Sequence, residues 1–265
     1  MKYAGHLHTE DPLYRYLQTD ILPEAGGRTA DPEFRVFSLK ASKQVYIYEE
    51  QRSHTRFVGK FFFSNGNRSH KAASHDMERE FSNLNYLRTI GFTVGPHYIP
   101  RPLGCNAELN SLLMEEFCYG TTLDAFIIGA IQRGDKNLFF EKLTALARFL
   151  AALHNTTATS HAVEVTHDFS YFGRIIGQLA KWGHLHSGET ENLTRLKECW
   201  REKHSLWDQN QVIVHGDVTP SNILLGDGSW VMGLDLERMT KADRVFDLGR
   251  LAAEIKHFFM QHTGD

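Results

Sequence analysis

The chain has 265 residues, with 29 Lys and Arg against 32 Asp and Glu, and its formal net charge is −3. This near balance excludes a basic nucleic-acid-binding surface, and the lack of any apolar run of about 18 residues excludes a transmembrane helix. The three cysteines have no metal-type spacing and are odd in number, which argues against a disulfide framework. We therefore expect a cytoplasmic protein that buries roughly 70–75% of its unfolded surface without disulfides. Its oligomeric state stays open.

Alternating apolar residues predict an antiparallel sheet in the first part of the chain. A short helix is expected first, at Pro12–Leu22. The strands that follow are expected at Phe34–Lys40, Val45–Glu49 and Arg56–Phe63. After the turn at 65–67, a helix is expected at Asp76–Thr89, because apolar residues recur there at helical spacing.

A carboxylate interrupts the apolar face of that helix. Met77, Glu80, Leu84 and Leu87 share one face, so Glu80 needs a cationic or hydrogen-bonding partner if the face is buried. Lys60, in the middle of the preceding strand, is the candidate. Such a Lys–Glu pair holds a lysine against the α- and β-phosphates of ATP in kinases. The alternative is a lysine that snorkels from a sheet edge and a glutamate at the rim of the face.

The loop Ala41–Gln44 joins the first two predicted strands, where a glycine-rich phosphate flap would be expected. It contains no glycine. Backbone amides of a tight turn can still approach a phosphate, and Ser42 can add its hydroxyl. Ser42 is therefore a candidate nucleotide contact.

The next segment predicts a hairpin and then a break between two parts of the chain. Strands are expected at Arg101–Asn106 and Ser111–Phe117, and Thr121 and Asp124 have the spacing of a capping box. We expect a nucleotide-binding lobe at 1–114, a hinge at 115–121 and a helical lobe at 122–265. The extended backbone at Glu115 and Phe117 is a candidate contact for an adenine edge; the alternative is an ordinary strand-to-helix linker.

Helical periodicity follows the break. Phe140, Leu143, Ala147, Leu150 and Leu153 form the expected apolar face of the second helix. Large aromatic residues on the later helices either line a substrate pocket or serve packing; these are Tyr171, Trp182, Trp200 and Trp207. The four helices are expected at Asp124–Gln132, Leu138–His154, Phe172–Leu185 and Glu191–Trp207.

The stretch His215–Asn222 carries the strongest chemical signal in the chain. It follows a predicted strand at Gln211–Val214 and precedes a hairpin, whose strands are expected at Ile223–Leu225 and Trp230–Leu236 around a Gly-Asp-Gly-Ser turn. Asp217 and Asn222 thus lie on the loop before the hairpin, and Asp235 lies near the end of its second strand.

The residue types suit phosphoryl transfer. Asp217 is the candidate base that accepts a hydroxyl proton, while Asn222 and Asp235 offer the hard oxygen ligands that Mg²⁺ prefers. Glu237 is two residues beyond Asp235, so on a strand both would share a face, and Glu237 is a candidate contact for a second metal or its water shell. Each residue alone would more often be structural, since Asp and Asn commonly cap their own turns.

The motifs at 215–222, at Leu234–Glu237 and at Asp247–Arg250 together resemble those of the aminoglycoside phosphotransferase and choline kinase group of protein-kinase-like small-molecule kinases. The resemblance runs from about Phe34 to His257. It implies a two-lobed α+β fold, with an antiparallel-sheet N-lobe and a mainly helical C-lobe.

The same resemblance implies a role for each matching position. Lys60 resembles the ATP-phosphate lysine and Glu80 its helix partner. Asp217 resembles the catalytic base and Asp247 an aspartate that braces the catalytic loop. The Mg²⁺ ligands of the family are matched by Asn222 and Asp235.

The expected activity is Mg²⁺-dependent transfer of the γ-phosphoryl group of ATP to a hydroxyl of a small molecule. Gly216 replaces the arginine of the His-Arg-Asp motif of protein kinases, and Asp235 and Asp247 lie only twelve positions apart, which leaves no room for a long peptide-binding segment. Relatives usually continue with further helices beyond the position of Asp265, so we expect a compact or shortened member. The alternatives are an inactive nucleotide-binding module and, more weakly, transfer to a protein side chain.

Overall fold

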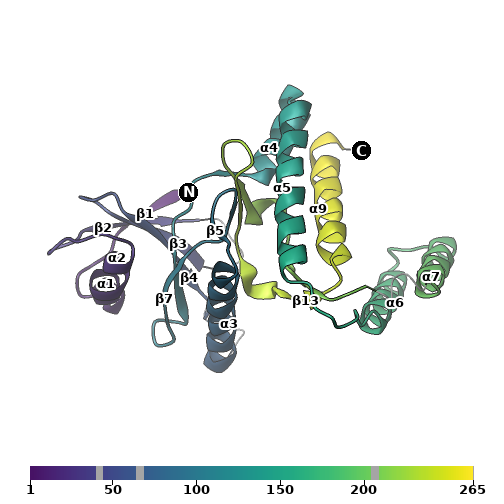
Figure 1. Ribbon diagram of the computed structural model, residues 1–265, viewed down its shortest axis with the longest axis horizontal. Coiled ribbons are helices and arrows are strands. Elements are labelled where there is room, and N and C mark those ends of the chain that lie inside the picture. Colours follow the sequence, from purple (N-terminus) through teal and green to yellow (C-terminus); the bar gives the residue numbers. More distant parts are fainter. Residues whose placement is uncertain (40–43, 64–68, 204–208, 265) are drawn as a thin grey trace.

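The computed structural model describes residues 1–39, 44–63, 69–203 and 209–264. Ser42 and Trp207 lie outside the described residues. An antiparallel sheet with one long flanking helix forms one part of the molecule, and a group of helices with short strands forms the other (Figure 1). The predicted two-lobed α+β fold is confirmed.

The N-terminal sheet has six strands among the described residues, all paired antiparallel with their neighbours. One edge strand, β1, was not predicted. Its side chains are mostly exposed on both faces, so no apolar alternation marks it, and only its pairing with β2 makes it a strand. The strands in spatial order are β1 (Lys2–His6), β2 (Phe34–Ser38), β3 (Gln44–Glu50), β4 (Arg56–Phe61), β8 (Leu112–Glu116) and β7 (Pro102–Asn106).

A helical segment packs on this sheet near the N-terminus. It starts at Asp11, whose carboxylate caps the chain by accepting from the Leu13 amide at 2.9 Å. It consists of α1 (Pro12–Tyr16), one π-helical stretch η1 (Leu17–Ile21) and α2 (Leu22–Glu24). Leu17 and Ile21 are buried with Phe34 and Phe57 of the sheet. The predicted helix is therefore present and extends slightly further.

The long helix α3 (His70–Thr89) packs beside β7 and β8. It begins six residues before the predicted start, because the Ser69 hydroxyl caps it through the Ala72 amide at 3.3 Å. The predicted face is confirmed, with Met77, Glu80, Leu84 and Leu87 all buried. Glu80 is thus a carboxylate inside the fold.

A second small sheet links the two parts of the molecule. The predicted hairpin supplies β11 (Ile223–Leu225) and β12 (Val231–Gly233), and β12 pairs in parallel with β6 (His97–Tyr98), which itself pairs with β5 (Thr93–Val94). The strands β5 and β6 were not predicted, because each has only two residues and shows no alternation of apolar side chains. On the other side, β9 (Thr121–Thr122) pairs with β11. Thr122 rather than Thr121 occupies the N-cap position of the next helix, and its side chain makes no capping hydrogen bond.

Three helices pack together in the second part: α4 (Leu123–Arg133), α5 (Lys136–Thr156) and α9 (Val245–Thr263) (Figure 1). The predicted apolar face of α5 is partly wrong, because Phe140 and Ala147 are exposed. Two polar residues, Lys142 and His154, occupy buried positions instead. A hydrophobicity pattern cannot show this, since it assigns both to the solvent side.

Two further helices, α6 (Thr166–Lys181) and α7 (Ser187–Arg201), form a hairpin that extends beyond α5 and α9 (Figure 1). Both start earlier than predicted and contact chiefly each other. The aromatic residues on or beside these helices, Tyr171, Trp182 and Trp200, are exposed and are not part of the core. Within the described part of the chain, no helix has the length and apolar character needed to cross a membrane.

Candidate active site

The predicted catalytic loop connects β10 (Val212–Val214) to the β11–β12 hairpin. The hairpin's second strand ends at Gly233, three residues before the predicted end. Gly216 has φ +82°, and a Cβ there would lie 2.2 Å from the carbonyl oxygen of Arg238. Only glycine fits this close approach without strain, which explains the residue that stands in place of the protein-kinase arginine.

Asp217 lies on this loop with a partner at each carboxylate oxygen. The side-chain amide of Asn222 donates to its carbonyl oxygen at 3.1 Å and to Oδ2 at 3.3 Å. Arg250 of α9 donates from Nη2 to Oδ1 at 3.0 Å. The carboxylate therefore has a defined orientation, and its side chain keeps 15% of its surface exposed.

Asp247, also on α9, is fully buried beneath the same loop. Its carboxylate accepts from the backbone amides of His215 and Gly216 at 2.9 and 3.0 Å. The structure thus places Asp247 where the resemblance implied, in contact with the loop that carries Asp217.

His154 completes this network and was missed by sequence analysis. Its Nε2 lies 2.9 Å from Oδ2 of Asp247. The available signal was a histidine at the end of the predicted helix Leu138–His154, but its partner is 93 residues away. Burial lowers the pKa of the neighbouring His215, and the carboxylates of Asp247, Asp235 and Asp217 oppose that shift without reversing it.

Lys60 is almost fully buried between two carboxylates. Its Nζ lies 2.6 Å from Oε1 of Glu80 and 2.8 Å from Oε1 of Glu115. Burial by itself lowers the pKa of this lysine, but the charges of Glu115, Glu80 and Asp235 outweigh it and raise the pKa well above its usual value. The predicted Lys60–Glu80 pair is present, and Glu115 is a second partner that sequence analysis did not foresee.

Two residues were predicted to offer backbone groups to an adenine edge. Glu115 lies within β8, opposite Val58 of β4, and its side chain points to Lys60. Phe117 follows the strand and packs edge-on against Tyr119, with ring centroids 4.8 Å apart. Their contact with a base stays a prediction.

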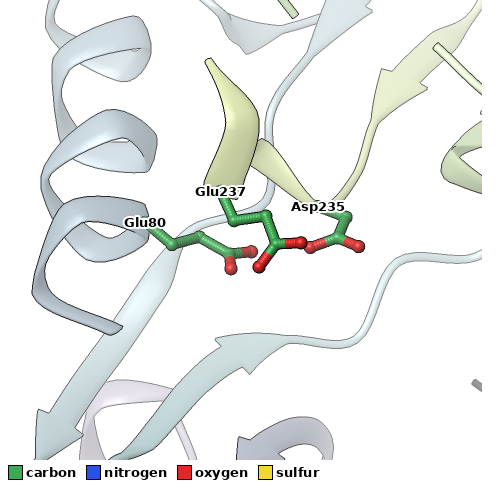
Figure 2. Close-up of side chains that lie close together, drawn as sticks. All are labelled: Glu80, Asp235 and Glu237. Atoms are coloured by element: carbon green, nitrogen blue, oxygen red, sulfur yellow. The ribbon is translucent and has the colours of Figure 1, made fainter. Parts of the chain in front are cut away.

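Three carboxylates meet beside Lys60. Figure 2 shows Glu80 of α3 facing Asp235 and Glu237, and ligand oxygens of all three lie within 4.8 Å of one another. The expected strand geometry of the last two is wrong: Asp235 has φ +59° and precedes the 3₁₀ turn Leu236–Arg238. The left-handed residue and the turn, rather than strand alternation, bring the two side chains to one place.

Asn222 adjoins this cluster through the backbone. The Leu234 amide, next to Asp235, donates to the carbonyl oxygen of Asn222 at 2.8 Å. The Asn83 side chain of α3 also donates to the Leu236 carbonyl at 2.8 Å, so the helix that carries Glu80 is tied to the turn that carries Glu237. Oxygen ligands from the two parts of the chain are thereby held together.

A pocket of about 770 Å³ lies apart from these groups, between the 116–121 segment, α5 and the β11–β12 turn. Tyr98, Phe117, Phe126 and Trp230 are among its lining residues. Neither Asp217 nor the carboxylate cluster borders it. The pocket therefore does not mark the place where the candidate catalytic groups converge.

Comparison with known proteins decides the family. The family model described as "Phosphotransferase enzyme family" matches residues 33–264, which is most of the chain. The chain belongs to the phosphotransferase enzyme family. The predicted family and enzyme class are confirmed.

Solved structures of phosphotransferases share the fold of this family member at low sequence identity. The GDP complex of aminoglycoside 2′-phosphotransferase-IIIa aligns with a TM-score of 0.60 at 14% identity, over 95% of this chain and 83% of that one. Choline kinase LicA from Streptococcus pneumoniae gives 0.53 at 15%, over 95% and 80%. Ethanolamine kinase from Plasmodium vivax gives 0.53 at 14%, over 87% and 67%. No curated protein matches the sequence.

Proposed function

We propose that this phosphotransferase moves the γ-phosphoryl group of ATP, in the presence of Mg²⁺, to a hydroxyl group of a small molecule. The observation that carries the proposal is the set of a buried Lys–Glu pair, an oxygen-ligand cluster and an oriented aspartate, with Asn222 hydrogen-bonded both to Asp217 and to the residue before Asp235. Phosphoryl transfer needs positioning and charge stabilisation, and these groups supply both.

Lys60 is the proposed phosphate-binding residue. Its side chain is held by Glu80 and Glu115, so the ammonium has a defined place from which it can reach phosphate oxygens. Its raised pKa keeps the charge present at neutral pH. The predicted contribution of Ser42 to the phosphates stays a proposal, as does the hinge at 115–121 between the lobes 1–114 and 122–265.

Asn222, Asp235 and Glu237 are the proposed Mg²⁺ ligands. Their donor atoms are hard oxygens, which Mg²⁺ prefers, and the close approach of Glu80, Asp235 and Glu237 concentrates negative charge that a cation would neutralise. When bound, the metal would offset charge on the phosphates. Glu80 is already bound to Lys60, so we assign the ligand role to the residues of the loop and turn.

Asp217 is the proposed base. The acceptor oxygen forms a bond to the γ-phosphorus as its proton passes to the Asp217 carboxylate, and the bond from the γ-phosphorus to the β–γ bridging oxygen breaks, so ADP leaves with that electron pair. Asn222 and Arg250 orient the carboxylate for this transfer. Asp247 holds the loop backbone beneath it.

A small acceptor fits this chain better than a peptide. The segment between Asp235 and Asp247 consists of a 3₁₀ turn, the short strand β13 (Thr240–Ala242) paired with β10, and the start of α9. It therefore presents no long activation segment. The solved relatives named above include kinases of an aminoglycoside, choline and ethanolamine, which supports a small alcohol as the acceptor class.

Replacing the proposed base tests this function. We expect Asp217→Asn to lower ATP turnover with a small-molecule acceptor by roughly 10²–10⁴, because the proton loses its acceptor, while ATP affinity changes by no more than about threefold. Turnover is measured as ADP release across an acceptor panel, and affinity by thermal shift with ATP and Mg²⁺. Asp227→Asn, in the exposed hairpin turn, is the matched control.

Normal turnover by Asp217→Asn would contradict the role of this residue. ATP binding by the wild-type protein without ADP release for any acceptor would favour the inactive nucleotide-binding module. Radiolabelled phosphate that appears on a polypeptide would favour transfer to a protein side chain.

A further inference from the structure

Arg250 contacts the proposed base directly, although the motif around Asp217 does not include it. It lies three residues after Asp247 on α9, so both side chains project from one face of this helix. Asp247 contacts the backbone of the catalytic loop, and Arg250 contacts its Asp217 side chain. Its Nη2 lies 3.0 Å from Oδ1 of Asp217 and 3.2 Å from Oε1 of Glu254. A permanently charged group therefore adjoins the carboxylate that is to receive the acceptor proton.

The guanidinium has hydrogen-bond donors to spare. Nη2 makes both of the contacts just described, one to Asp217 and one to Glu254. Among the described residues, no protein group accepts from Nε or Nη1 of Arg250, and 40% of the side chain is exposed. Donors that lack a protein partner thus lie open to solvent beside the reacting carboxylate.

These donors constrain what can bind next to the reacting hydroxyl. A guanidinium donates hydrogen bonds and accepts none, and it does not lose its proton in proteins. A hydroxyl, carboxylate or phosphate oxygen would be stabilised there. An ammonium group would find no acceptor on Arg250 and would meet a like charge. Asp217 and Glu254 each already give one oxygen to Arg250, which weakens the attraction of these carboxylates for an ammonium group.

We propose that Arg250 is an acceptor-binding, specificity-determining residue: the acceptor presents a neutral or anionic oxygen next to the hydroxyl that is phosphorylated, and no ammonium group. This inference rests on the proposed function and names the charge class of its acceptor. The proton still passes to Asp217, and Arg250 takes no part in bond making.

Matched acceptors that differ in one substituent test the inference. Glucose, glucosamine and glucuronate form one set; glycerol, serinol and glycerate form a second, smaller set. We expect kcat/KM for the aminated member of the productive set to be at least about tenfold below the neutral or anionic member, a difference of about 1.4 kcal/mol. In Arg250→Ala, the ratio of kcat/KM between the neutral or anionic member and the aminated member should fall to about threefold or less. Arg250→Lys should restore part of this ratio.

Compounds that are not phosphorylated are measured as inhibitors of the transfer of the γ-phosphoryl group to water. We expect the aminated member of each set to have a higher inhibition constant than the neutral or anionic member. Arg250→Gln, which keeps donors but no charge, separates charge from hydrogen bonding. Arg244→Ala is the control for loss of an arginine from the same helix end, since Arg244 donates to Asn155 and not to the catalytic loop. Each variant is checked for an unchanged thermal midpoint.

Preference for the aminated member by the wild-type protein would overturn the inference, as would an unchanged ratio in Arg250→Ala. So would a wild-type protein that hydrolyses ATP but neither uses nor is inhibited by any of the six compounds. A wild-type protein that binds Mg-ATP and never releases ADP would instead contradict the proposed function itself, together with the inference that rests on it.

Discussion

At the residue scale, the ion pairs of the buried Lys60 affect both the stability of the fold and the proposed nucleotide site. Its ammonium is paired with two buried carboxylates, Glu80 and Glu115, which have exposures of 0% and 3%. Burying one such charge without a partner is costly. The same lysine is therefore both a proposed ligand-binding group and a structural counter-ion, and its replacement affects stability as well as nucleotide binding.

We predict that Lys60→Met lowers the free energy of unfolding by about 3–5 kcal/mol, because both carboxylates lose their cation in the interior. Urea unfolding measures this change. The thermal shift produced by ATP and Mg²⁺ should disappear in the same variant. Lys256→Met, at an exposed position of α9, serves as the control. A variant as stable as wild type would show that the carboxylates are neutralised in another way.

At the scale of the element, α5 joins the core to the catalytic hairpin through a buried lysine. Lys142 donates to the carbonyl oxygens of Gly226 and Gly228 at 3.0 and 2.9 Å. These two backbone acceptors of the turn between β11 and β12 therefore have a hydrogen-bond donor. The first turn of α9 has a similar function, since Asp247 satisfies the amides before Asp217. Both helices therefore position strands and loops by hydrogen bonds to backbone groups.

Lys142→Met should destabilise the protein by about 1–3 kcal/mol, because it leaves two turn carbonyls without their donor. Chemical denaturation followed by tryptophan fluorescence gives the difference. Lys136→Met, at the exposed start of the same helix, should change the free energy of unfolding by less than about 0.5 kcal/mol. Equal effects of the two substitutions would rule out the proposed role of Lys142.

At the scale of the molecule, most elements pack around two clusters of buried apolar residues, and the α6–α7 hairpin stands apart from both. The main cluster of buried apolar residues draws on both parts of the chain, including Met77 and Leu84 of α3, Phe149 of α5 and Ile223 of β11. By contrast, α6 and α7 contact chiefly each other. Local stability follows the number of buried contacts that an element makes.

Hydrogen exchange should reveal this difference. We predict that backbone amides of α6 and α7 exchange at least about tenfold faster than those in the middle of α5, because the hairpin can open without disrupting the core. Mass spectrometry of deuterated peptides provides the measurement, and α9 serves as an internal reference for a helix packed on the core. Protection of α7 equal to that of α5 would contradict the prediction.

The sequence by itself indicated most of the longer elements and the residue types of the proposed site. Residue spacing identified the strand, loop and hairpin around Asp217, and the apolar stripe of α3 marked Glu80 as a buried carboxylate in need of Lys60. These features are local, or depend on one regular period, so a linear pattern records them.

Only the tertiary structure decided which distant groups meet. The second carboxylate on Lys60, the His154–Asp247 contact and the Arg250–Asp217 pair each join residues far apart in the chain, and α5 hides its polar residues on a face that hydrophobicity assigns to solvent. Asp235 and Glu237 converge through a left-handed residue and a 3₁₀ turn, not through a strand. Such contacts depend on how the chain packs in three dimensions, because a buried polar group is stabilised by whichever partner the fold brings to it.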